Sequence, residues 1–119
     1  MNNNVSWMVE LAIKDGELDN FRNLMIEMVD ATQANEPDTL NYEWAISEDN
    51  KTIHIYERYA DSAAALTHMG TFGEKYAERF MASIDQTSFV VYGNPNNEAK
   101  AVLAGVGAVF MPPFGGFTR

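Results

Sequence analysis

The stretch LNYEWAISEDNKTIHIYERYADSAAALTHM, residues 40–69, contains two strands, the turn between them and the start of a helix. Apolar and polar side chains alternate over residues 40–46 and again over residues 52–60, and this period of two is typical of half-buried strands. The polar residues 48–51 lie between the two runs and predict a turn, so the stretch folds back on itself as a hairpin. A helix then begins at the pair Asp61-Ser62.

Pairing Ser47 with Thr52 predicts the register of this hairpin. On one face the register pairs Ile46 with Ile53, Trp44 with Ile55, Tyr42 with Glu57 and Leu40 with Tyr59. On the other face it pairs Ala45 with His54, Glu43 with Tyr56 and Asn41 with Arg58. A slip of one residue would exchange the two faces, so the register decides which side chains enter the core.

Before the hairpin, the sequence predicts one strand and one helix. Residues 5–14 alternate between apolar and polar side chains and end at the turn pair Asp15-Gly16. Residues 18–32 then carry apolar side chains at helical spacing, with Asp15 as the candidate N-cap and Pro37 as the stop.

After the hairpin, the sequence predicts a broken helix, a fourth strand and a third helix. The helix that follows the hairpin is interrupted at Gly70 and Gly73 and resumes with helical spacing through Ile84. Residues 88–92 form the fourth strand, and residues 99–106 form a short helix.

The order strand, helix, strand, strand, helix, strand predicts a ferredoxin-like βαββαβ fold of the α+β class, with one antiparallel sheet and helices on one face. A chain of 119 residues suits a single domain, 1–119. Both faces of the hairpin carry bulky side chains, so we expect a second copy to cover the other face in a homodimer. The apolar C-terminal arm, residues 107–119, is expected to pack along its own domain or across the partner subunit.

The composition disfavours several classes of function. The chain carries 8 Lys and Arg against 17 Asp and Glu, a net charge of −9, which repels nucleic acid and anionic membrane surfaces. It has no cysteine, so disulfides, thiolate nucleophiles and Cys-ligated metals are ruled out. With two histidines no multi-histidine metal site can form within one chain, and we predict no metal. Since no leader or membrane-spanning pattern stands in the sequence, we expect a cytoplasmic protein.

Glu57 is the first candidate for chemistry. Its predicted face also carries Ile55, Tyr59 and Trp44. A carboxylate among such side chains has its charged form disfavoured, which suits general acid–base work. The alternatives are that this face is partly wet, or that Glu57 pairs with an arginine or with a buried hydroxyl such as that of Tyr42.

The two histidines have different expected places. His68 stands next to the predicted helix break, where its side chain could reach into a cavity above the sheet as a general base or as a hydrogen-bond donor. The alternative for His68 is a surface position stabilised by the C-terminus of the helix. His54 lies on the opposite face from Glu57, which favours a dimer-interface or exposed residue over a catalytic one.

The sequence holds more aromatic residues around the hairpin and second helix than a small core usually needs. Six of them are candidates for lining a pocket that accepts a flat ring: Tyr42, Trp44, Tyr59, Phe72, Tyr76 and Phe80. Apolar cavities with a few polar groups are the usual form of small-molecule sites. The alternative is ordinary core packing, in which aromatic side chains also dominate.

Residues 40–69, with the strand and helix before them, resemble the antibiotic biosynthesis monooxygenase family of the dimeric α+β barrel superfamily. The resemblance is carried by Tyr42-x-Trp44, the turn Ser47-Glu48-Asp49, the run Glu57-Arg58-Tyr59-Ala60-Asp61 and His68. It extends over most of the chain, from residue 5 to about residue 92. The ending AVFMPPFGGF, residues 108–117, is similar to the extra strand and tail of some members.

The resemblance implies a homodimer of ferredoxin-like subunits, each with a pocket between sheet and helices. It also implies a cofactor-independent monooxygenase that oxidises a small aromatic or quinol substrate with O2, without metal or flavin. In that reaction Glu57 or His68 would help to deprotonate a phenol, and Tyr42, Trp44 and Tyr59 would orient the ring. The alternative is a non-catalytic dimeric barrel that binds a hydrophobic metabolite or acts in a stress response, and a lyase or isomerase is a third hypothesis.

Haem-degrading relatives use an Asn on the first strand, a Trp and an axial His. The corresponding positions here read Met8-Val9-Glu10, His68 and residues 74–78 without histidine, which disfavours haem cleavage.

Overall fold

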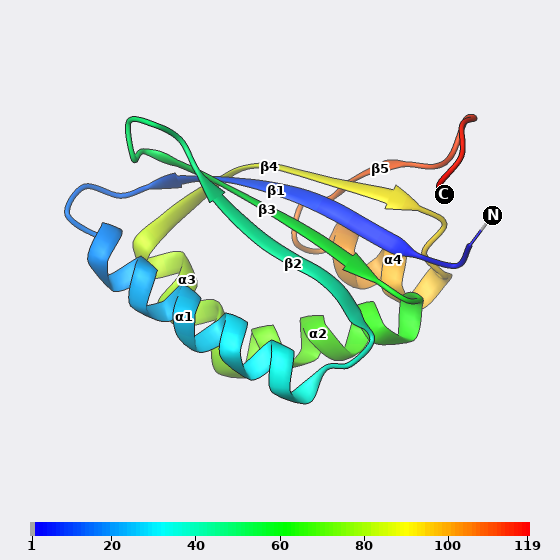
Figure 1. Ribbon diagram of the computed structural model, residues 1–119, viewed down its shortest axis with the longest axis horizontal. Coiled ribbons are helices and arrows are strands. Elements are labelled where there is room, and N and C mark those ends of the chain that lie inside the picture. Colours follow the sequence, from blue (N-terminus) through cyan, green and yellow to red (C-terminus); the bar gives the residue numbers. More distant parts are fainter. Residues whose placement is uncertain (1) are drawn as a thin grey trace.

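The computed structural model describes residues 2–119. The strands form one sheet, and the amphipathic helices pack on one of its faces (Figure 1). The elements in chain order are β1 (Val5–Ile13), α1 (Leu18–Asn35), β2 (Thr39–Ile46), β3 (Thr52–Tyr59), α2 (Ser62–Lys75), α3 (Ala77–Ser83), β4 (Ile84–Gly93), α4 (Asn97–Ala104) and β5 (Val109–Met111). The predicted ferredoxin-like α+β fold is confirmed.

The sheet has five strands in the order β2-β3-β1-β4-β5, with β1 at its centre. The four predicted strands pair antiparallel, whereas β5 pairs parallel to β4 and makes the sheet mixed. The parallel pairing follows from α4, because a helical crossover returns the chain in the same direction as the strand before it. The expected extra strand near the C-terminus is thus present.

The hairpin register is confirmed over most of its length. β2 and β3 pair as predicted from Ile46 opposite Ile53 to Asn41 opposite Arg58. The predicted pairing of Leu40 with Tyr59 is wrong, because a register shift places Thr39 opposite Tyr59. A bulge of this kind leaves one residue unpaired, and the side chain of Leu40 is 44% exposed.

The start of α1 differs from the prediction. The N-cap is Glu17 rather than Asp15, and its side chain makes no capping hydrogen bond. Gly16 with a φ of +79° completes the turn after Asp15, so the helix begins after that turn. The helix buries four side chains against the sheet: Phe21, Leu24, Met28 and Thr32.

The predicted break of the second helix at Gly70 and Gly73 is also wrong. α2 continues through both glycines to Lys75, and the chain bends at Tyr76 before α3 begins. Both glycines lie on the exposed side of α2, where a missing side chain removes no core contact. Ile84, which was expected in the helix, is the first residue of β4.

All four helices lie on one side of the sheet, and no helix of residues 2–119 covers the other side, which we call the open face (Figure 1). The open face exposes Tyr92, Val109 and Met111, three apolar side chains from β4 and β5. Beyond β5, Phe114 is fully exposed and Phe117 nearly so, so these two residues do not pack along their own domain as one expectation had it. None of the described helices is long and apolar enough to cross a membrane.

Candidate active site

A cavity of about 340 Å³ lies between the helix-covered face of the sheet and helices α1, α2 and α3. Its walls are the following residues: Trp7, Val9, Met28, Tyr42, Ile55, Glu57, His68, Met69, Phe72, Ala77, Phe80, Met81, Gln86, Phe89 and Val106. Met81, Gln86 and Val106 are the exposed members and mark the opening. The volume lies in the range of small-molecule sites.

Glu57 enters the cavity from the middle of β3, between two aromatic neighbours. It lies opposite Trp7 of β1 and Tyr42 of β2, and it is 6% exposed. The hydroxyl of Tyr59 donates a hydrogen bond to its Oε1 atom at 2.5 Å. Glu57 therefore has a buried hydroxyl partner, as one alternative supposed, but the partner is Tyr59 and not Tyr42.

His68 reaches the same end of the cavity from α2. It is 5% exposed, so the alternative of a surface position is wrong. Its Nε2 atom lies 3.3 Å from Oε1 of Glu57, and its Nδ1 atom lies 2.9 Å from Oε1 of Glu36. Its ring packs against Tyr42 and Tyr59, with centroids 5.2 Å away in both cases. The structure thus brings Glu57 and His68 into direct contact at one wall of the cavity.

Glu36 completes this cluster, and the sequence reasoning missed it. It is the C-cap of α1, and its Oε1 atom also accepts a hydrogen bond from the Thr39 hydroxyl at 3.1 Å. A signal was present, because Glu36 continues the i, i+4 series of the buried residues Met28 and Thr32. That series directs its side chain toward the sheet.

The protonation state of the cluster follows from its contacts. Burial opposes a charged imidazole, but the hydrogen bonds and charges of Glu36 and Glu57 outweigh burial and raise the pKa of His68 to about 9. Burial favours the neutral form of Glu36, yet the His68 contacts outweigh it and lower the pKa of that carboxyl. At neutral pH His68 is therefore an imidazolium, which donates hydrogen bonds and does not accept a proton.

Two phenols beside the cluster stay neutral. Burial, together with the negative charge of Glu57, raises the pKa of Tyr42 and of Tyr59 well above the usual range. Tyr59 therefore keeps its proton and donates it in the hydrogen bond to Glu57.

The predicted pocket aromatics divide into two groups. Tyr42, Phe72 and Phe80 line the cavity, whereas Trp44, Tyr59 and Tyr76 do not. Trp44 is half-buried and packs against the core, with its ring centroid 5.7 Å from that of Phe21 in α1 and 6.4 Å from that of Phe80 in α3. Tyr59 stands behind the cluster, and Tyr76 is buried where α2 meets α3.

The sequence reasoning overlooked two rings that line the cavity from the central strands. These are Trp7 of β1 and Phe89 of β4, whose centroids lie 5.7 Å apart. Alternation placed Trp7 on the buried face, but alternation does not separate a cavity wall from close packing.

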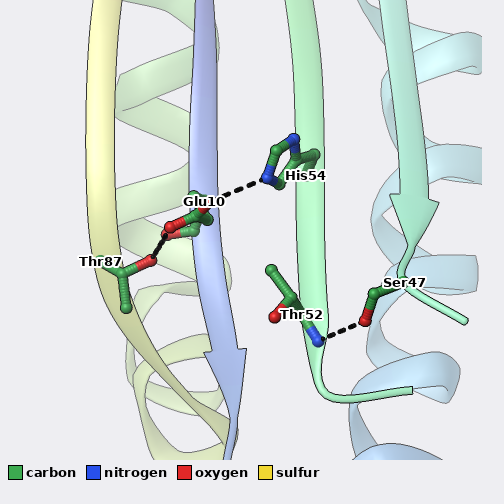
Figure 2. A network of polar contacts seen from close by, with 5 residues as sticks. All are labelled: Glu10, Ser47, Thr52, His54 and Thr87. Atoms are coloured by element: carbon green, nitrogen blue, oxygen red, sulfur yellow. Dashed lines mark hydrogen bonds and ion pairs between the residues drawn. The ribbon is translucent and has the colours of Figure 1, made fainter. Parts of the chain in front are cut away.

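His54 belongs to a different cluster on the open face. Figure 2 shows its ring directed toward Glu10 of β1, and the Nε2 atom lies 2.9 Å from Oε1 of that carboxylate. The hydroxyl of Thr87 donates to Oε2 of Glu10 at 2.8 Å. The side chain of His54 is about half exposed, so the expectation of an open-face residue is confirmed. No group of three or more potential ligands in residues 2–119 is placed to hold a metal ion.

Comparison with known proteins gives one family and several similar folds. The family described as antibiotic biosynthesis monooxygenase matches residues 5–83, from β1 to the end of α3. No curated protein sequence matches the chain significantly.

Three solved structures illustrate the similarity of fold. MupZ from Pseudomonas fluorescens is 22% identical, with a TM-score of 0.86 over 99% of this chain and 96% of its own. SnoaB, a cofactor-independent oxygenase from Streptomyces nogalater, is 12% identical, with a TM-score of 0.65 over 80% and 96%. A conserved protein from Methanosarcina mazei Go1 is 15% identical, with a TM-score of 0.65 over 75% and 90%.

Proposed function

Because the chain belongs to the antibiotic biosynthesis monooxygenase family, we propose that it is a cofactor-independent monooxygenase that oxidises a small aromatic or quinol substrate with O2. One observation carries the proposal. The buried carboxylate of Glu57 and the imidazolium of His68 line one wall of a cavity whose other lining residues are uncharged. The similarity to SnoaB, which is a cofactor-independent oxygenase, supports the same reaction class.

The proposed reaction needs a proton acceptor, a cation and a dry pocket. A phenol passes its proton to Glu57, and the resulting phenolate is electron-rich enough to reduce O2. O2 adds to a ring carbon as a peroxide anion, and the O–O bond and the C–H bond at that carbon then break to leave a carbonyl. The distal oxygen and the ring hydrogen depart as hydroxide, which takes back the proton held by Glu57 and becomes water. One oxygen atom thus enters the quinone and the other leaves as water.

The hydrogen bonds of the cluster suit these roles. Within residues 2–119, the contacts of Glu57 with Tyr59 and His68 both use Oε1, which leaves Oε2 for a substrate hydroxyl. The imidazolium of His68 stabilises the negative charge that develops on the substrate oxygen. Trp7, Phe72 and Phe89 supply flat apolar walls for a ring and keep water away from the reacting atoms.

The same proposal includes a homodimer formed through the open face. The exposed residues Tyr92, Val109 and Met111 form an apolar strip there, and the largely exposed rings of Phe114 and Phe117 extend from its edge. A second copy packed sheet to sheet covers the strip, and the arm at residues 107–119 then reaches the partner subunit.

A second candidate is a redox-neutral proton transfer, that is, a lyase or isomerase reaction. The direct contact between His68 and Glu57 favours it, because an acid beside a base moves protons without needing O2. The remaining alternative is a non-catalytic protein that binds a hydrophobic metabolite or acts in a stress response. Binding of this kind needs only the cavity and not the pair of Glu57 and His68.

Oxygen uptake with a panel of naphthols, anthrones and hydroquinones tests the proposal. We expect uptake matched by quinone formation, with a loss of roughly 10²-fold or more in kcat for Glu57→Gln and for His68→Ala. Glu10→Gln and His54→Gln are matched controls, because they change the same residue types on the open face. Turnover under argon favours the proton-transfer enzyme, and tight binding without turnover favours the binding protein.

A further inference from the structure

Glu36 does not line the cavity, but it contacts the Nδ1 atom of His68, whose imidazole ring does. We propose that Glu36 is a positioning residue that keeps His68 cationic, so that Glu57 alone exchanges a proton with the substrate. The inference rests on the proposed function, since it assigns the roles within that site.

The geometry places the His68 ring between two carboxylates. Nδ1 lies 2.9 Å from Glu36 and Nε2 lies 3.3 Å from Glu57. Both nitrogens can donate a hydrogen bond to these carboxylates only when both carry protons. The shorter contact is the one to Glu36. The side chains of all three residues are nearly buried, so solvent screens these charges little.

The position of Glu36 in the helix supports a role other than helix stability. It stands at the C-terminal end of α1, where the helix dipole disfavours a carboxylate. It also precedes Pro37, which fixes where the helix stops. The imidazolium of His68 is the group that compensates a negative charge at this place.

The two carboxylates have different surroundings, and this difference separates their roles. Glu36 borders a small surface hollow with Pro37 and Thr39, and it accepts a hydrogen bond from the Thr39 hydroxyl. The hydrogen bond from Thr39 stabilises its ionised form. Glu57 instead faces the apolar cavity, where a substrate proton is available. Glu36 thus serves as the fixed charge, and Glu57 serves as the exchangeable one.

Three elements place groups beside His68 that bear on its charge. Glu36 comes from the end of α1, Tyr42 from β2, and Glu57 and Tyr59 from β3. The two phenols are neutral, so the carboxylates are the charges that face the ring. Without Glu36, the imidazole loses its closer counter-ion and becomes a second proton acceptor beside Glu57.

NMR titration of the His68 imidazole in the full-length protein tests the assignment. Glu36→Gln keeps an oxygen for Nδ1 and removes the charge, so we expect the His68 midpoint to fall by more than about one pH unit. Glu10→Gln is the matched control, because it removes a carboxylate that contacts the other imidazole and leaves the His68 midpoint in place.

Activity gives a second readout that a purely structural role would not move. In Glu36→Gln, the pH profile of kcat shifts with the new His68 midpoint, while KM changes little. Glu36→Asp keeps the negative charge but moves it one methylene further from the imidazole. We therefore expect the His68 midpoint in this variant to lie between those of the wild type and Glu36→Gln.

An unchanged His68 midpoint in a folded Glu36→Gln variant would overturn the inference. If that variant does not fold, an unchanged midpoint in Glu36→Asp overturns it equally. The titration needs no substrate. Absence of oxygen uptake would therefore refute the proposed reaction without affecting the test of the role of Glu36.

Discussion

Raising the pH should remove a defined part of the stability of this protein, because His68 must then lose its proton in the folded state. Its pKa is about 9 in the structure against 6.5 for an unperturbed histidine. A raised pKa contributes stability that is complete below about pH 6.5 and is lost as the pH rises through 9. The difference corresponds to about 3 kcal/mol of the free energy of unfolding.

Urea unfolding of the wild type and of His68→Gln at pH 6, 8 and 10 measures this contribution. Other groups that lose protons at high pH are common to both proteins and cancel in the difference. We expect the free-energy difference between the two proteins to shrink by about 3 kcal/mol from pH 6 to pH 10. Parallel curves for the wild type and His68→Gln would refute the buried ion pair.

Three further predictions follow from particular contacts. Tyr59→Phe removes the donor to the buried Glu57 carboxylate and should lower the free energy of unfolding by about 2 kcal/mol in urea, whereas Tyr56→Phe on the open face should change it little. Gly70→Ala should raise the melting temperature and add up to about 1 kcal/mol, because the position is helical and an added Cβ meets no atom within 4 Å; a lower melting temperature would contradict this. Truncation after Gly107 removes β5 and the arm, so sedimentation should shift from dimer toward monomer, and an unchanged sedimentation coefficient would count against the arm contact.

The hairpin could be predicted from sequence because its alternation is local and regular. The pairing of Tyr42 with Glu57 depends only on the position of the turn, and it holds in the structure. The pairing of Leu40 failed because the bulge near Thr39 forms where the strand leaves the sheet toward α1. The break at Gly70 failed because packing of the opposite side of α2 outweighs a weak local preference.

The site was only partly accessible to the same reasoning. Strand parity placed Glu57 on an apolar face, whereas the helical pattern left His68 either above the sheet or on the surface. Glu36 lies 32 residues from His68 along the chain, so their contact depends on how the end of α1 meets α2. Trp7 and Phe89 are recognisable as buried, but side-chain packing in three dimensions decides that they border a cavity.

Isotope tracing tests the central claim most directly, namely that the pocket at Glu57 and His68 directs O2 onto a bound aromatic ring. The measurement is mass spectrometry of the product formed under ¹⁸O2 from whichever phenol or anthrone the wild type turns over. We expect one labelled oxygen atom in each quinone, formed at a rate that Glu57→Gln reduces and Glu10→Gln does not. Product that carries no label, or label incorporated equally fast by Glu57→Gln, would contradict it.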